Sequence, residues 1–188
     1  MRVAYADPPY VGQAKKFYAK HPDYAGEVDQ AALVARLVRE FPDGWALSCH
    51  VNSLRTILPL CHESVRVAAW VKPFAFFKPG VAPKYAWEPV LFVTTRSDRQ
   101  RRKFGIDSPR DWVSCNVHGA TEAERNRSTL RGRKPEAFCW WLFNLLGLAP
   151  GDELVDLFPG TGAVTAAWER YQREPCISGP LFAKETGA

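Results

Sequence analysis

The sequence predicts a single α/β domain, residues 1–188, built on a mostly parallel β-sheet. Strand-like apolar runs alternate with stretches of helical spacing, which is the pattern of parallel strands joined by helices. Of the 188 residues, 46% are hydrophobic and 24% are charged, which is the length and composition of a globular domain with a substantial core. Two loops rich in glycine or proline follow predicted strands, where open α/β sheets bind their ligands.

The first half of the chain predicts four strands and two helices. Apolar residues recur at helical spacing over 28–41, and the run Pro42-Asp43-Gly44 ends this helix. Ser53 is a candidate N-cap of a short second helix that ends near Leu60. Apolar runs bounded by polar or proline-containing segments predict strands at 2–6, 45–51, 65–71 and 90–95.

The second half predicts two loops, then a strand between two helices. The segment 72–89 holds four prolines and is interpreted as a structured loop, and 96–133 is polar with little periodicity, which is typical of a long loop or insertion. Pro135 suits the first turn of a helix that ends before Gly147. A strand at 153–158 and a helix at 163–171 follow.

Positive charge is concentrated in one part of the chain. The formal net charge is +5, and residues 96–134 contain eleven Lys or Arg against five Asp or Glu. A basic segment on a nearly neutral body indicates a polyanionic partner, although a solvated loop that keeps a protein in solution has the same composition.

The cysteines and the apolar runs favour a cytoplasmic protein. The five cysteines include no Cys-x-x-Cys pair, so the sequence predicts neither a disulfide framework nor a metal site. The longest apolar stretch, 137–149, is interrupted by Asn144 and is too short to span a bilayer. We therefore expect no membrane partner.

The turn Gly160-Thr161-Gly162 follows a predicted strand and precedes a predicted helix. Glycines at such a position let the backbone approach a ligand closely, and the helix N-terminus adds exposed amides. Taken alone, the pattern is also that of an ordinary tight turn.

The loop Asp7-Pro8-Pro9-Tyr10 is the more specific of the two. Its prolines stiffen the backbone and leave carbonyls without a local amide partner, so that a carboxylate and a carbonyl form a pair of acceptors. Such a pair suits an NH2 group and stabilises the positive charge that develops when its nitrogen attacks a sulfonium methyl. Tyr10 can stack on a base, whereas an isolated tetrapeptide of this kind is more often an Asp-Pro turn.

Three motifs together resemble those of the DNA amino-methyltransferases, and the likeness covers most of the chain. Asp7-Pro8-Pro9-Tyr10 resembles that family's catalytic motif, whose Asp-initial form is associated with adenine N6. The run Asp156-Leu157-Phe158-Pro159-Gly160-Thr161-Gly162 resembles its cofactor loop, and Lys134-Pro135-Glu136 resembles the segment before that loop. The catalytic motif comes first, which is the permuted order similar to the family's beta group, and 96–133 then stands in place of a target-recognition region.

The resemblance implies the Rossmann-like fold of S-adenosylmethionine-dependent methyltransferases with a permuted motif order, and S-adenosyl-L-methionine as cofactor. It implies that Asp7, Pro8, Pro9 and Tyr10 are catalytic. The residues implied to bind the cofactor are Asp7, Lys134, Asp156, Phe158, Pro159, Gly160, Thr161 and Gly162. The acidic residue that binds the cofactor ribose in the family has no counterpart at the expected place in the tail 172–188.

The resemblance also implies a nucleic-acid partner, with DNA preferred. A stacked base is out of reach, so the target base is flipped out or taken from a single strand, and Tyr10 with one of Trp70, Phe74 or Phe77 would receive its face. The residues implied to neutralise phosphates are Arg101, Arg102, Lys103, Arg125, Arg127, Arg131 and Arg133. Cytosine N4, adenine in RNA and a catalytically silent nucleic-acid-binding relative are the alternatives, and the oligomeric state, a homodimer included, is left open.

Overall fold

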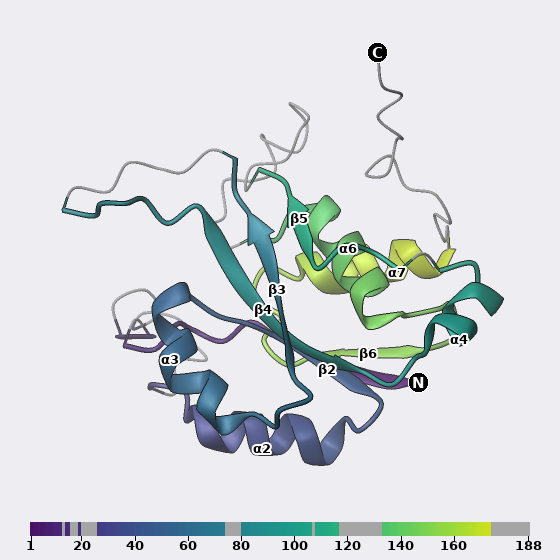
Figure 1. The fold of residues 1–188 in the computed structure, drawn as a ribbon, viewed down its shortest axis with the longest axis horizontal. Helices are drawn as coiled ribbons and strands as arrows, with labels where there is room; N and C mark the ends of the chain where they lie inside the picture. The colour runs from purple at the N-terminus through teal and green to yellow at the C-terminus, as the bar shows by residue number, and fades with distance from the viewer. Residues whose placement is uncertain are drawn as a thin grey trace.

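A six-stranded sheet forms the centre of the part of the chain that the computed structural model describes, namely residues 1–12, 14–15, 19, 26–73, 80–106, 108–116 and 133–173 (Figure 1). Its strand order is β5-β3-β4-β2-β1-β6. The strands are β1 (Arg2–Ala6), β2 (Gly44–Ser48), β3 (Arg66–Val71), β4 (Trp87–Thr94), β5 (Trp112–Ser114) and β6 (Glu153–Asp156).

Strand direction confirms the predicted mostly parallel sheet. β1 pairs in parallel with β2 and with β6, and β3 pairs in parallel with β5. β4 lies between β2 and β3 and runs antiparallel to both. Within the described residues, five strands therefore share one direction and β4 is reversed.

Helices cover both faces of this sheet (Figure 1). One face packs against α2 (Gln30–Glu40) and α3 (Leu54–Ile57), and the other against α6 (Glu136–Leu146) and α7 (Ala163–Arg173). Successive side chains of a strand point to opposite faces. Val3 and Tyr5 accordingly pack with α6 and α7, whereas Ala4 and Ala6 pack with α2. None of the helices in the described ranges is long and apolar enough to cross a membrane.

The predicted helices and strands are present, with shifted ends. Gly147 terminates α6 in the left-handed conformation, with φ +70°, as its position predicts. The predicted helix at 53–60 is broken into η1 (Val51–Ser53), α3 and η2 (Leu58–Leu60). Ser53 makes no side-chain cap bond there; the ring of His50 accepts from the Asn52 amide instead.

The segment 96–133 differs most from its prediction as a long loop. It contains α4 (Asp98–Lys103), which starts with a capping box formed by Ser97 and Gln100, and β5, which pairs with β3. Both elements are too short to show a hydrophobic period, which explains why the sequence pattern missed them. Residues 107 and 117–132 of the predicted loop lie outside the described residues.

A buried ion pair joins β6 to the end of β4. The Asp152 carboxylate lies 2.9 Å from the Arg96 guanidinium, and it accepts hydrogen bonds from the Met1 amino group (2.6 Å) and the Ala149 amide (2.8 Å). Burial acts to raise the pKa of Asp152, but these donors outweigh burial and hold the pKa below its usual value. Because Asp152 and Arg96 side chains are 8% and 7% exposed, loss of one partner leaves the other buried and unpaired.

We predict that Asp152→Asn lowers the free energy of unfolding at neutral pH by about 3–5 kcal/mol, because it leaves the buried Arg96 without its counter-ion. Because the pKa of Asp152 is lowered in the folded protein, the stabilisation by the ion pair is complete above the ordinary Asp pKa. This stabilisation is lost as the pH falls through the lower folded-state pKa. Urea unfolding of both proteins at several pH values measures the difference. An equal difference at all pH values would contradict the assignment.

Candidate functional site

The two predicted functional loops leave neighbouring strands at the same edge of the sheet. β1 and β6 are parallel neighbours, with Tyr5 opposite Asp156, and the Leu157 amide donates to the Tyr5 carbonyl at 2.9 Å. The chain therefore enters the Asp7 loop and the 158–162 loop side by side, at the carboxyl ends of both strands. This is the edge at which open α/β sheets bind ligands.

The 158–162 loop is shaped by its own backbone and by Asp156. The Asp156 carboxylate accepts from the Phe158 amide at 3.2 Å, and the Gly162 amide donates to the Pro159 carbonyl at 2.6 Å. Gly160 and Gly162 have φ of +47° and +70°, which other residues rarely adopt.

This loop is also open to a ligand. Pro159, Gly160 and Thr161 are exposed, and a Cβ placed on Gly162 would meet no atom within 4 Å. The loop leads directly into the N-terminus of α7, where backbone amides face outward. An anionic or polar ligand group can therefore reach the backbone here.

Asp7 and Lys134 form an ion pair in the middle of this edge. The Lys134 Nζ lies 3.0 Å from the Asp7 Oδ1. The Lys134 side chain is only 7% exposed, and its Nζ lies 5.1 Å from the ring centroid of Trp70 and 5.4 Å from that of Phe138. The Asp7 side chain is 23% exposed, so it is only partly covered. Pro8 is buried and Pro9 is half-buried beside it.

Glu88 and Lys72 extend this ion pair into a network of four charges, and the sequence motifs predicted neither residue. Glu88 Oε2 lies 3.8 Å from the Lys134 Nζ, and Glu88 Oε1 binds the Lys72 Nζ. Glu88 is 12% exposed and Lys72 is 19% exposed. The sequence does carry one signal for Glu88. Side chains two residues apart on a strand point to the same face, so Glu88 shares the face of Val90 and Phe92, which pack in the core.

The network sets the ionisation of its members. Burial raises the pKa of Asp7, and the nearby Lys134 ammonium offsets this only in part. Burial also opposes the charged form of Glu88, but Lys134 and Lys72 outweigh it and hold the pKa of Glu88 below its usual value. Burial acts to lower the pKa of Lys134, yet the two carboxylates raise it. Lys134 is therefore a fixed cation at neutral pH.

Tyr10 lies on the same network. Burial raises the pKa of Tyr10, and the charges of Glu88 and Asp7 raise it further, so the phenol stays protonated and its hydroxyl is a side-chain hydrogen-bond partner of Glu88. Its ring centroid lies 5.5 Å from that of His50, and the His50 ring is 4.7 Å from that of Tyr85. An aromatic group of three rings therefore continues from Tyr10 to the exposed Tyr85.

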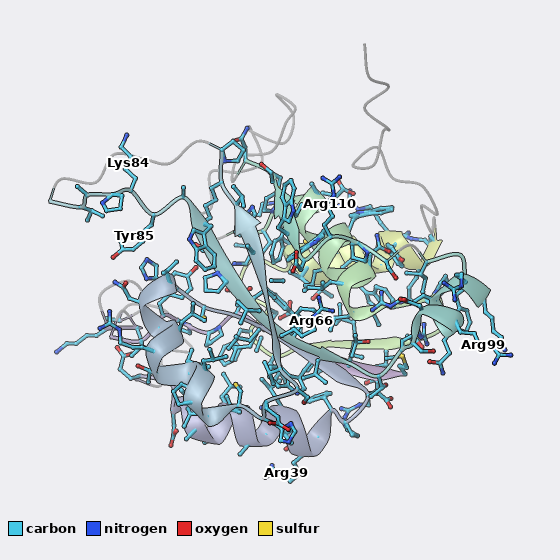
Figure 2. The ribbon with its side chains drawn as sticks, viewed as in Figure 1. Arg39, Arg66, Lys84, Tyr85, Arg99 and Arg110 are labelled. Atoms are coloured by element: carbon cyan, nitrogen blue, oxygen red, sulfur yellow. The ribbon has the colours of Figure 1, made fainter. Side chains whose placement is uncertain are left out.

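The basic residues of α4 lie away from this edge. Thr94, at the end of β4, pairs with Gly44 at the start of β2, so α4 follows the amino ends of the parallel strands. Figure 2 shows Arg99 of α4 at one end of the molecule and Lys84 and Tyr85 at the other. Arg102 and Lys103, both exposed on α4, are therefore remote from Asp7.

Arg101 is buried, which does not fit its predicted contact with phosphate. Its guanidinium donates to the carbonyls of Asn144 and Leu145, at the end of α6, and its side chain holds that helix terminus. Arg133 directly precedes Lys134 and is half-buried. Arg125, Arg127 and Arg131 lie outside the described residues.

Of Trp70, Phe74 and Phe77, the predicted aromatic partners of a base, the described residues include Trp70. Trp70 is 2% exposed, donates from Nε1 to the Cys115 carbonyl at 3.0 Å and packs on Phe138, so it belongs to the core beneath Lys134. Phe74 and Phe77 lie outside the described residues, as does the tail 174–188. Asn52 exchanges hydrogen bonds with the Tyr85 hydroxyl.

Comparison with solved structures shows the fold. The chain is similar to M1.HpyAVI in complex with SAM (TM-score 0.54, 15% identity, 90% of this chain and 78% of that one) and to M1.HpyAVI alone (0.55, 13%, 91% and 76%). It is also similar to TTHA0409 of Thermus thermophilus, assigned as a DNA modification methylase (0.50, 15%, 92% and 77%). No protein-family model and no curated protein matches the sequence. The chain thus has the methyltransferase fold of these structures, as the resemblance implied.

We predict that Lys134→Met lowers the free energy of unfolding at pH 7 by about 2–3 kcal/mol, less than for a fully buried pair because Asp7 keeps some contact with water. The unpaired Asp7 carboxylate then has a still higher pKa, and its protonation at low pH removes the cost. The destabilisation should therefore shrink as the pH falls. Denaturant unfolding between pH 4 and pH 8 measures it, and a destabilisation that grows toward low pH would exclude this pairing.

Proposed function

We propose that the chain is an S-adenosylmethionine-dependent methyltransferase that acts on the exocyclic amino group of a nucleic-acid base, with adenine N6 in DNA as the preferred acceptor. The observation that carries the proposal is the partly exposed Asp7 carboxylate beside the open 158–162 loop, at one edge of the sheet. The shared fold with M1.HpyAVI, which was solved with SAM, supports it.

The residues at this edge fit the cofactor. Bound there, S-adenosyl-L-methionine supplies a methyl group on a positively charged sulfur. Phe158, Pro159, Gly160, Thr161 and Gly162 would hold it through backbone approach, since the loop is exposed and nothing fills the space at Gly162. Asp156, which accepts from the Phe158 amide, would keep the loop in shape rather than contact the cofactor itself.

Asp7 and the Pro8 carbonyl would hold the amino group of the base. An amino nitrogen conjugated to an aromatic ring is a poor nucleophile, and two acceptors on its hydrogens localise the lone pair and stabilise the developing positive charge. The nitrogen would bond to the methyl carbon as the bond between that carbon and the sulfur breaks, which leaves the sulfur as a neutral thioether, and the nitrogen would then lose one proton to water. Because only the ionised Asp7 carries the negative charge that offsets the developing positive charge, methyl transfer should slow as the pH falls through the raised pKa of Asp7.

Tyr10 would form one wall of the base site. Its ring centroid lies 5.5 Å from that of His50 and its hydroxyl interacts with Glu88, so the ring would already be held in place when a base stacks against it. A base must leave the duplex to reach this wall. Tyr85, which Figure 2 labels, is exposed and is linked to Tyr10 through the His50 ring, so it could stack against an adjacent nucleotide.

The phosphate contacts of this proposal differ from those first expected on α4. Arg133 adjoins Lys134 and can face a nucleic acid bound at this edge, and Arg125, Arg127 and Arg131 remain candidates from the sequence alone. Arg101 is excluded from the proposal because its guanidinium holds the end of α6. Arg102 and Lys103 could contact only a nucleic acid long enough to extend along the sheet to α4.

Methyl transfer from radiolabelled S-adenosylmethionine to DNA and to RNA tests the proposal, with the labelled nucleoside identified by chromatography. We expect label in N6-methyladenine from DNA, and Asp7→Ala should reduce the rate by roughly a hundredfold or more, since acceptors aimed at developing charge have effects of that size. Glu40→Gln, which removes a carboxylate at the end of α2, is the control and should keep the wild-type rate.

The same assay separates the alternatives. Label in N4-methylcytosine, or in RNA alone, would move the acceptor while keeping the reaction. A wild-type protein whose melting temperature rises with the cofactor, but which labels no nucleic acid, would instead be a catalytically silent relative and would contradict the proposal.

A further inference from the structure

Lys134 is shared between two carboxylates rather than paired with one. Its Nζ lies 3.0 Å from the Asp7 Oδ1 and 3.8 Å from the Glu88 Oε2. The second Glu88 oxygen is bound by Lys72, which fixes the carboxylate at the opposite end. The other Glu88 oxygen, Oε2, therefore faces an ammonium that already contacts Asp7.

This arrangement matters for the proposed methyl transfer, on which the inference rests. An ammonium bound to Asp7 competes with the amino group of the base for the same carboxylate. It also places a full positive charge next to a nitrogen that becomes positive during the reaction, which opposes that step. Asp7 is a stronger acceptor, and offsets more of the developing positive charge, when Lys134 has another anion to contact.

We propose that Glu88 is a positioning residue that draws Lys134 away from Asp7, so that the Asp7 carboxylate can accept the amino group of the target base. To lie 3.0 Å from the Glu88 Oε2, as it now lies from the Asp7 Oδ1, the Lys134 Nζ must move at least 0.8 Å from its present distance of 3.8 Å. The ammonium stays paired throughout, as a buried cation packed beside Trp70 and Phe138 requires.

The structure shows why Glu88 can act in this way. It stands opposite Trp70 in the β3–β4 ladder, so its side chain and that of Trp70 share the face that carries Lys134. The lysines keep Glu88 ionised despite its burial. Among the described residues, seven titratable groups interact electrostatically with Asp7. They are Lys134, Lys72, Glu88, Asp156, Tyr5, Tyr10 and Cys49.

Glu88→Gln tests the proposal because it removes the competing charge and keeps the shape. Lys134 should then pair with Asp7 alone, which lowers the pKa of Asp7, since Glu88 raises it in the wild type and a closer ammonium lowers it. The plateau of kcat/KM should fall by roughly ten- to a hundredfold, because the acceptor is blocked. The acidic limb of the pH profile should at the same time move to lower pH.

A direct titration provides a readout besides activity. In the protein without cofactor, labelled with ¹³C at the Asp carboxyl carbons, the signal that disappears in Asp7→Asn reports Asp7. Its midpoint should lie lower in Glu88→Gln than in the wild type. In Lys72→Met it should lie higher, because Lys72 lowers the pKa of Asp7 and its loss leaves Glu88 to Lys134 alone. Glu40→Gln removes one partner of the exposed Arg36–Glu40 ion pair, which is remote from Asp7, and should leave the midpoint unchanged.

Two results would overturn the proposal. One is a Glu88→Gln protein with the wild-type rate, and the other is a slower protein whose Asp7 midpoint is unmoved or raised, as a merely structural loss would give. A wild-type protein that transfers no methyl group refutes the proposed function instead, and the carboxyl titration then still decides whether Glu88 competes for Lys134. Should Glu88→Gln fail to fold, the Lys72→Met titration decides, and an Asp7 midpoint that does not rise there would reject the proposal.

Discussion

The candidate site depends on one buried ammonium group. Lys134 is 7% exposed and packs beside two aromatic rings, so its charge is tolerated only with carboxylates in contact. Asp7 at the end of β1 and Glu88 at the start of β4 provide them, while Lys134 itself stands before α6. A single cation thus joins three elements that are far apart in the sequence.

The reversed direction of β4 makes this junction geometrically possible. In a parallel sheet all strands begin at one edge and end at the other, so the edge that bears Asp7 receives only strand ends. β4 runs against β2 and β3 and begins at that edge, which brings Glu88 there instead. Lys72 lies just past the carboxyl end of β3, which runs in the common strand direction. The antiparallel strands β3 and β4 therefore place a basic and an acidic side chain at the same edge of the sheet.

Local chemistry explains what the sequence could predict. The Asp7 loop and the 158–162 loop are recognisable because prolines and glycines restrict the backbone where they stand, and Gly147 marks the end of α6 for the same reason. Glu88 could not be found in this way, since its partners come from strand pairing. Pro89 also weakens the prediction of a strand at Glu88, because a proline argues against a strand interior. In the structure the Pro89 carbonyl accepts from the Cys49 amide, and the strand pairing continues past it. Arg101 shows that charge in a sequence does not reveal burial.

The shared lysine also explains how one cluster can be both stable and reactive. Two carboxylates and two ammonium groups balance in charge, which limits the cost of burying them. If Lys134 neutralised Asp7 completely, however, no net negative potential would remain at Asp7 for a nitrogen that becomes positive. Dividing the ammonium between two carboxylates keeps the cluster neutral overall while Asp7 retains part of its charge. The raised pKa of Asp7 fits this division, because its pairing compensates burial only in part.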